Sequence, residues 1–343
     1  MVVGAGCCCG CSGRRKGRRL VREVVGVALN LEAAVGDRLA LAVVAQYRLV
    51  TTEQLHLLTA AGVRVEQTRR RLMKLREEGL VERVTLPQAG RRRVWFATAY
   101  GVQVASEWPE LRGFAAPRLI ADPTAARLRV AHALAVSEVG LSFVQDARAR
   151  GDICQPLDWI PEVHHPLGGG EAVIPDAVLF YRACSGSMLR AFVEVDRATM
   201  GPERLAAKVT AYARLHAYIP MAPPGRRRQA GGVQTEPDWR HRYPLFPRLL
   251  FVLDGIGAAG VDHRISALNA AAHELEVGGL LREVPVLAVS MADLLQRGPS
   301  APVWRPVQDP AQRVGWMSRP VRHAAAQPVV QEPTTPRPWP PQA

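Results

Sequence analysis

The sequence predicts a two-domain α+β protein, in which a small, basic, mainly helical domain precedes a larger mixed α/β domain. The chain has 343 residues, more than a typical single domain needs. Its positive charge is concentrated near the N-terminus. Beyond a stretch with prolines and glycine at residues 109–121, which we interpret as a linker, one long helical pattern is followed by β-prone runs and further helical patterns.

Composition and charge point to a nucleic-acid partner. Hydrophobic residues make up 48% of the chain, and the net charge is +13. Residues 1–19 carry five Lys or Arg and no acid, and residues 63–93 carry ten against four Glu, so these two segments hold most of the excess. Charge gathered on one small domain and its leading arm is typical of a protein that binds a polyanion, and nucleic acid is the first candidate.

Neither a membrane span nor a secretory signal is expected. No uncharged apolar run reaches the roughly 18 residues of a membrane helix, and residues 1–19 lack the apolar centre of a signal peptide. The expected location is therefore the cytoplasm. Cys8 and Cys11 form a lone C-x-x-C beside Cys7 and Cys9, without a second pair at zinc-site spacing. Residues 1–36 are interpreted as a disordered, basic, cysteine-rich leader.

Residues 37–108 predict a winged helix. Helices are expected from Asp37 to Tyr47, after Thr51, where Gln54 completes a capping box, and from Val65 to Glu78, with Gly79 as terminator. Two β-prone runs, 80–86 and 94–97, then flank a turn, and a further helix follows to about residue 107. Three helices followed by a hairpin with a basic tip is the plan of a winged helix.

In that plan the third helix enters the major groove of double-stranded DNA and the hairpin contacts the backbone or the minor groove. Arginine suits both tasks, because its fork grips phosphate or guanine. A solvated charged helix surface is the alternative. The residues predicted to bind DNA are Arg69, Arg70, Arg71 and Lys74 on the helix and Arg91, Arg92 and Arg93 at the wing.

The larger domain is expected over residues 122–297. It should begin with a long, largely buried helix, 122–150, which contains Glu138. Strands at 174–181 and 191–195, a helix from Pro202, and further strands at 249–253 and 284–289 follow. From about Gly298 the chain is rich in proline, so residues 298–343 are predicted to form an extended or disordered tail.

Three acids interrupt the apolar strands of this domain. Asp176 heads one strand, and Glu194 and Asp196 lie two residues apart on the next, so these two share a face. Clustered carboxylates need a cation or a basic partner. Mg²⁺ or Mn²⁺ bound by Asp176 and Glu194 is one solution, and Lys208, four residues before Tyr212, would face the same cluster. Pairing with arginine at the surface is the other solution.

The order helix, three strands, helix, strand, with Pro175-Asp176 and Glu194-Val-Asp196, resembles the PD-(D/E)XK restriction-endonuclease-like fold. The resemblance implies that Asp176 and Glu194 bind metal, that Lys208 replaces a missing lysine, and that Glu138 adds an acid from the first core helix. Asp196 stands where that lysine is expected, which is a departure. Asp176, Glu194, Asp196, Lys208 and Glu138 are the implied catalytic residues.

Residues 37–307 together resemble the replication-relaxation family of plasmids and integrative elements. The segments that carry this likeness begin at His132, Pro175, Glu194, Lys208, Asp293 and Pro302. The resemblance implies a DNA-binding protein of a mobile element, with replication or conjugation proteins as partners. Two functions stay open: a metal-dependent endonuclease or nickase, and a non-catalytic regulator or replication accessory whose nuclease-like domain is degenerate.

Overall fold

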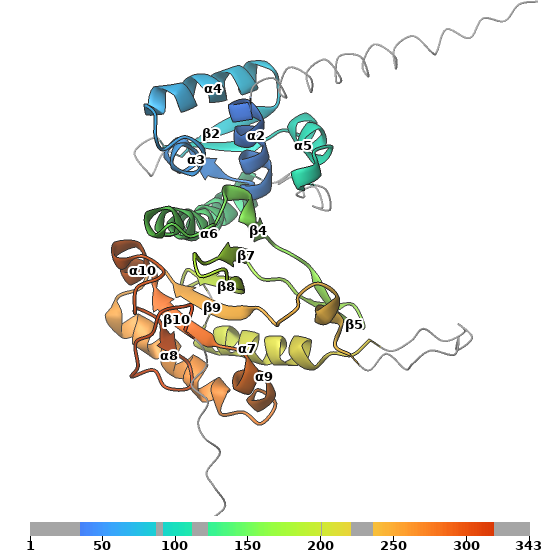
Figure 1. Ribbon diagram of the computed structural model, residues 1–343, viewed down its shortest axis with the longest axis vertical. Coiled ribbons are helices and arrows are strands. Elements are labelled where there is room, and N and C mark those ends of the chain that lie inside the picture. Colours follow the sequence, from blue (N-terminus) through green and yellow to red (C-terminus); the bar gives the residue numbers. More distant parts are fainter. Residues whose placement is uncertain (1–34, 87–91, 112–122, 200, 221–235, 319–343) are drawn as a thin grey trace, which may run out of the picture.

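The computed structural model describes residues 35–86, 92–111, 123–199, 201–220 and 236–318 (Figure 1). Together they form a mixed α+β protein. The predicted linker, 109–121, lies largely outside these ranges, as does most of the leader.

The N-terminal part contains the predicted order of three helices, a hairpin and a fourth helix. The helices are α2 (Val35–Tyr47), α3 (Thr52–Thr59), α4 (Val65–Glu77) and α5 (Ala99–Ser106). Strands β1 (Val50–Thr51), β2 (Val81–Leu86) and β3 (Arg92–Ala97) form an antiparallel sheet in the order β1-β3-β2. A single 3-10 turn, η1 (Pro109–Leu111), follows α5.

Local sequence explains where these helices begin and end. The Thr51 hydroxyl accepts from the Gln54 backbone N–H, and the Gln54 side chain accepts from the Thr51 N–H, so the predicted capping box is confirmed. Gly79 follows α4 with φ +73°. Its N–H donates to Arg76 O, and the N–H of Leu80 donates to Leu75 O, which is the hydrogen-bond pattern of a Schellman motif. The chain turns there because glycine adopts positive φ without a Cβ penalty.

The C-terminal part is built on a six-stranded mixed sheet. Its order is β11-β10-β9-β8-β7-β4, with β8, β9 and β10 parallel and the outer pairings antiparallel. The strands are β4 (Trp159–Pro161), β7 (Ala177–Arg182), β8 (Met188–Asp196), β9 (Arg248–Leu253), β10 (Val286–Ser290) and β11 (Arg305–Pro306). A separate hairpin, β5 (His165–Gly168) and β6 (Glu171–Val173), is inserted before β7.

Helices cover both faces of this sheet. On one side lie α6 (Pro123–Arg150) and α10 (Met291–Arg297), and on the other α7 (Pro202–Ala217), α8 (Ala258–Ala272) and α9 (Gly278–Glu283). Two further 3-10 turns are η2 (Pro156–Asp158) and η3 (Asp238–His241). Side chains along β8 alternate between the two faces of the sheet. Val193 and Val195 join the core on the α6 side, and Phe192 joins the core on the α7 and α8 side.

The N-terminal part and the sheet share one buried core. A continuous apolar cluster runs from α2 and α3 through α6 to the sheet. Polar side chains reinforce this junction by donating to backbone carbonyls across it. Gln46 Nε2 donates to Leu157 O, Tyr47 Oη to Pro156 O, and Ser137 Oγ to Leu49 O at 2.9–3.0 Å. These contacts satisfy buried carbonyls and fix the position of α2 against the sheet.

The prediction that the chain loses its structure from Gly298 is wrong for residues up to 318. Trp304, Val307 and Trp316 are fully buried. The Trp316 ring packs edge-on against Phe143 and Tyr181, at 5.3 and 5.0 Å between centroids. The proline content suggested an extended tail, but an extended segment still orders where large aromatic side chains find core contacts. Trp239 and Tyr243 are also buried, in the core on the α7 and α8 side of the sheet.

Trp316→Ala should destabilise the fold by about 3–5 kcal/mol, because it removes a fully buried indole and leaves a cavity. Urea denaturation of the full chain measures this loss. Arg313→Ala, which alters an exposed side chain of the same segment, should shift the midpoint little. Equal midpoints for the two variants would show that residues 308–318 do not belong to the core.

Candidate functional site

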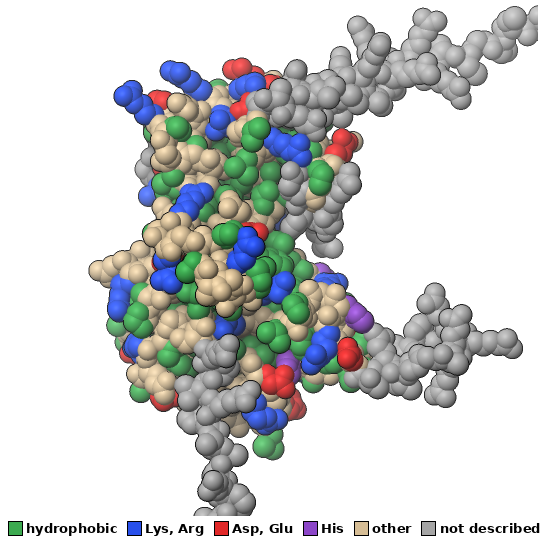
Figure 2. Space-filling model, viewed as in Figure 1, with side chains coloured by type: hydrophobic (Ala, Val, Ile, Leu, Met, Phe, Trp, Pro, Cys, Tyr) green, Lys and Arg blue, Asp and Glu red, His purple; other side chains and the backbone are tan. Residues whose placement is uncertain are grey.

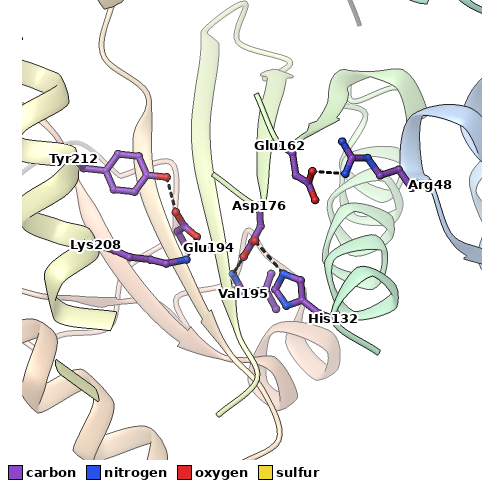
Figure 3. Close-up of polar contacts among 8 residues, drawn as sticks. All are labelled: Arg48, His132, Glu162, Asp176, Glu194, Val195, Lys208 and Tyr212. Carbon is purple, nitrogen blue, oxygen red and sulfur yellow. Dashed lines mark hydrogen bonds and ion pairs between the residues drawn. The ribbon is translucent and has the colours of Figure 1, made fainter. Parts of the chain in front are cut away.

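The predicted acids come together at adjoining ends of β7 and β8. Ala177 pairs with Val193 in the antiparallel register, so Asp176, one residue before β7, faces the Glu194 position of β8. Glu194 and Asp196 are 2% and 3% exposed, so neither is a solvated surface acid. The prediction that the three acids lie close together is therefore confirmed for Asp176 and Glu194 (Figure 3).

Asp176 has a protein donor on each oxygen. Its Oδ1 lies 3.0 Å from His132 Nε2 of α6, and its Oδ2 accepts the Val195 backbone N–H at 2.7 Å. Burial by itself would raise the pKa of Asp176, but the His132 hydrogen bond, the Lys208 charge and the Val195 N–H outweigh burial and leave the pKa lowered. The same hydrogen bond raises the pKa of His132.

Glu194 is held by the two α7 residues that helical spacing placed on one face. Lys208 Nζ lies 2.5 Å from Oε2, and Tyr212 Oη donates to Oε1 at 2.6 Å. Burial raises the pKa of Glu194 to about 7, even though Lys208 acts in the opposite direction. The predicted placement of Lys208 beside the acids is confirmed, and in this structure it neutralises a buried carboxylate.

Asp196 turns toward α8. Its Oδ2 forms an ion pair with Arg264 Nε, and its Oδ1 accepts the Ala198 N–H at 3.1 Å. Arg264 is itself buried. Asp196 thus serves as the counter-ion of a buried arginine from a distant helix. Sequence reasoning missed Arg264, because it lies 68 residues away on a helix whose position depends on the sheet.

Glu138, the acid that the resemblance implied for the first core helix, contacts a different element. Its Oε2 accepts from Gln54 Nε2 of α3 at 2.6 Å, and the same amide also donates to Leu134 O. This contact belongs to the junction between α3 and α6. The expectation that Glu138 joins the acid cluster is therefore corrected. The side of α6 that carries Glu138 packs on the N-terminal part.

Arg48 and Glu162 form an ion pair beside the cluster, and no sequence pattern predicts this contact (Figure 3). Both residues have positive φ, 67° and 51°, which is uncommon for residues other than glycine. The backbone N–H of Glu162 also donates to Asp176 O at 3.2 Å. A salt bridge between the N-terminal part and the sheet thus ends next to Asp176.

A divalent metal does not fit the cluster in this arrangement. Carboxylate oxygens are suitable ligands for Mg²⁺ in kind. However, all six oxygens of Asp176, Glu194 and Asp196 already contact protein donors, four of them on side chains and two on the backbone. Among the described residues, no group of three or more His, Cys, Asp or Glu is arranged to hold a metal ion. Metal binding would require Lys208 or His132 to move.

The predicted DNA-binding side chains divide into two groups. Arg71 Nε and Lys74 Nζ each lie 2.8 Å from a carboxylate oxygen of Asp37, which is buried on α2. These two residues hold α4 on α2. Arg71 is partly buried by this contact, which corrects its expected outward position, whereas Lys74 stays exposed. Exposed side chains without a contact to Asp37 are Arg69, Arg70, Arg92 and Arg93, while Arg91 lies outside the described residues.

Comparison with known proteins supplies the family. The family model described as replication-relaxation matches residues 41–223, just over half of the chain, so the protein belongs to the replication-relaxation family. A search of curated proteins gives no match. No helix in the described parts of the chain is both long enough and apolar enough to cross a membrane.

Two solved structures are similar to a smaller part of the chain. An apo ZitR mutant from Lactococcus lactis is 20% identical over 29% of this chain and 70% of its own, with a TM-score of 0.20. A MarR mutant from E. coli, complexed with operator DNA, is 20% identical over 28% of this chain and 68% of its own, with a TM-score of 0.22. At these TM-scores the two structures carry no argument about this fold.

The cluster predicts a pH-dependent stability. A carboxyl with a folded pKa of about 7 and an unfolded pKa near 4.5 binds an extra proton in the folded state between these values. Its contribution to stability therefore falls as pH rises from about 4.5 to 7. His132 acts in the same direction, because the stability from its raised pKa is lost as pH rises through the folded value.

Relative to wild type, Glu194→Gln should thus gain stability as the pH rises from 5 to 8, because it lacks the carboxyl whose contribution falls over this range. Urea titrations of both proteins across this range measure the difference. Gln145→Glu, which changes the same pair of residue types at an exposed position of α6, is the control and should show no such trend. A pH-independent difference for Glu194→Gln would show that Glu194 titrates at an ordinary pKa.

Proposed function

We propose that this protein binds double-stranded DNA for a mobile element, through a winged-helix domain formed by α2 to α5. In this proposal α4 enters the major groove and the β2–β3 hairpin is the wing. The observation that carries the proposal is the set of exposed arginines on α4 and at the start of β3, on two elements that the fold places in one domain: Arg69, Arg70, Arg92 and Arg93.

The position of α4 supports this role. It lies at the outer end of the molecule, with α2 and α3 between it and the sheet (Figure 1). In the space-filling view Lys and Arg side chains gather at that end (Figure 2). A duplex that binds there meets positive charge, which gives sequence-independent affinity through release of counterions. Replication or conjugation proteins, as further partners, stay a prediction.

For the sheet domain we propose a scaffold role without catalysis. Its acids are paired with Lys208, His132 and Arg264, and each buried charge has a partner inside the protein. Removing one partner from such a pair costs about 3–5 kcal/mol, since it leaves a buried charge without compensation. A structural role, in which the cluster fixes α6, α7 and α8 around the end of β8, is therefore enough to account for these acids.

A metal-dependent endonuclease or nickase is the second candidate. It is favoured by one observation, the gathering of Asp176, Glu194 and Lys208 at adjoining strand ends, the residue types that the PD-(D/E)XK resemblance implies. Mg²⁺ or Mn²⁺ as cofactor stays a prediction. It would need a rearrangement in which Lys208 or His132 leaves its carboxylate, for instance when DNA phosphate competes for the lysine.

DNA binding should depend on the exposed arginines of the winged-helix domain. Replacing Arg69, Arg70, Arg92 and Arg93 by Gln should weaken binding to a duplex and flatten the slope of log K against log salt by up to about four units. Fluorescence anisotropy at several salt concentrations measures both quantities.

A control with the same charge change replaces four exposed arginines of the sheet domain by Gln: Arg204, Arg282, Arg297 and Arg313. It should retain most of the salt slope. If the two quadruple variants lose the same amount, the effect is one of net charge and the winged-helix surface is not the DNA site.

The melting temperature decides between the two roles of the sheet domain. If the sheet domain is a scaffold, millimolar Mg²⁺ or Mn²⁺ should leave the wild-type melting temperature unchanged, because only a ligand that binds the folded state stabilises the fold. Supercoiled plasmid should stay intact under the same conditions. A metal-induced rise that Asp176→Asn abolishes, accompanied by nicking, would establish the second candidate instead.

A further inference from the structure

The outward face of α4 can be assigned from what the helix buries. Thr68, Leu72 and Leu75 are fully buried and define its inward side. With 3.6 residues per turn, Arg70 falls nearly opposite this side, and Gln67 lies one turn earlier beside the same outward face. Both side chains are exposed. The face that a groove would meet is therefore centred on Arg70.

The charged neighbours of Arg70 on α4 are already engaged. Arg69 pairs with Glu66 at 2.7 Å, and Arg71 and Lys74 share Asp37. Within the described residues, the Arg70 guanidinium and the Gln67 amide have no side-chain hydrogen bond or ion pair. These two groups are thus available to a ligand without breaking an existing contact.

We propose that Arg70 and Gln67 are the specificity-determining residues of this protein, and that they read a guanine and an adenine on neighbouring base pairs in the major groove. The inference rests on the proposed DNA-binding function and adds to it the bases that α4 recognises. The remaining arginines of the domain then supply affinity, and Asp37 with its two partners holds the reading helix in position.

The chemistry of the two side chains supports the assignment. Arginine donates two parallel hydrogen bonds to guanine O6 and N7, and glutamine pairs in a bidentate manner with adenine N6 and N7. Residues three apart on a helix are about 4.5 Å apart along its axis, close to the roughly 3.4 Å between stacked bases. Both also lie in the N-terminal half of α4, the end of a recognition helix that contacts base edges.

Selection from a pool of short random-sequence duplexes tests the proposal. The full-length wild type should enrich sequences in which a guanine is adjacent to an adenine. Arg70→Ala should lose the preference for that guanine, by about tenfold or more against substituted duplexes, and Gln67→Ala should lose the preference for the adenine. Arg70→Lys keeps the charge but not the fork, so it should bind with weakened guanine preference.

The paired change Arg92→Gln with Arg93→Gln is the control, because it removes charge from the wing without touching α4. It should weaken binding to all duplexes alike and leave the enriched sequence unchanged. Circular dichroism melts of each variant verify the fold, and the exposed positions of Arg70 and Gln67 predict little change.

An unchanged base preference in Arg70→Ala and Gln67→Ala, with weaker binding to every duplex, would overturn this inference and leave the proposed DNA binding intact, because both residues would then contact phosphate only. Wild-type protein that binds no duplex in the pool would overturn the proposed function together with the inference.

Discussion

The burial of two carboxylates at the end of β8 is the constraint on which the arrangement of the sheet domain depends. A buried carboxylate is costly unless a cation or several donors compensate it. Glu194 and Asp196 project from the same face of β8, and their compensation comes from α7 through Lys208 and Tyr212 and from α8 through Arg264. The two helices that cover this face are therefore tied to the strand by charge as well as by apolar packing.

Asp176 extends this network to the other face of the sheet. Through His132 it reaches α6, and through the neighbouring Glu162 and Arg48 the contacts continue to the N-terminal part. Because α6 also shares a core with α2 and α3, the proposed DNA-binding domain has a fixed orientation relative to the sheet.

Much of the fold followed from local patterns. The capping box at Thr51 and the glycine stop at Gly79 are interactions within a few residues, so their sequence signals suffice. The same applies to Lys208 and Tyr212, which meet Glu194 together because they are four residues apart on one helix. The prediction of a disordered tail was wrong at Trp316 because long-range contacts, and not local patterns, order this segment. Proline-rich composition describes the local backbone, whereas the order of that segment comes from a ring inserted between Phe143 and Tyr181, which are far away in sequence.

The sequence by itself determined the helices and hairpin of the N-terminal part, the basic character of residues 63–93 and the placement of two acids on one face of β8. Helix spacing, strand alternation and charge are properties of neighbouring residues. Only the tertiary structure decided what each charge does. Lys74 and Arg71 meet Asp37, Asp196 meets Arg264, Glu138 meets Gln54, and Arg70 is left exposed on α4. These partners come from other elements, and a charged side chain takes its role from the groups that packing brings within hydrogen-bond distance.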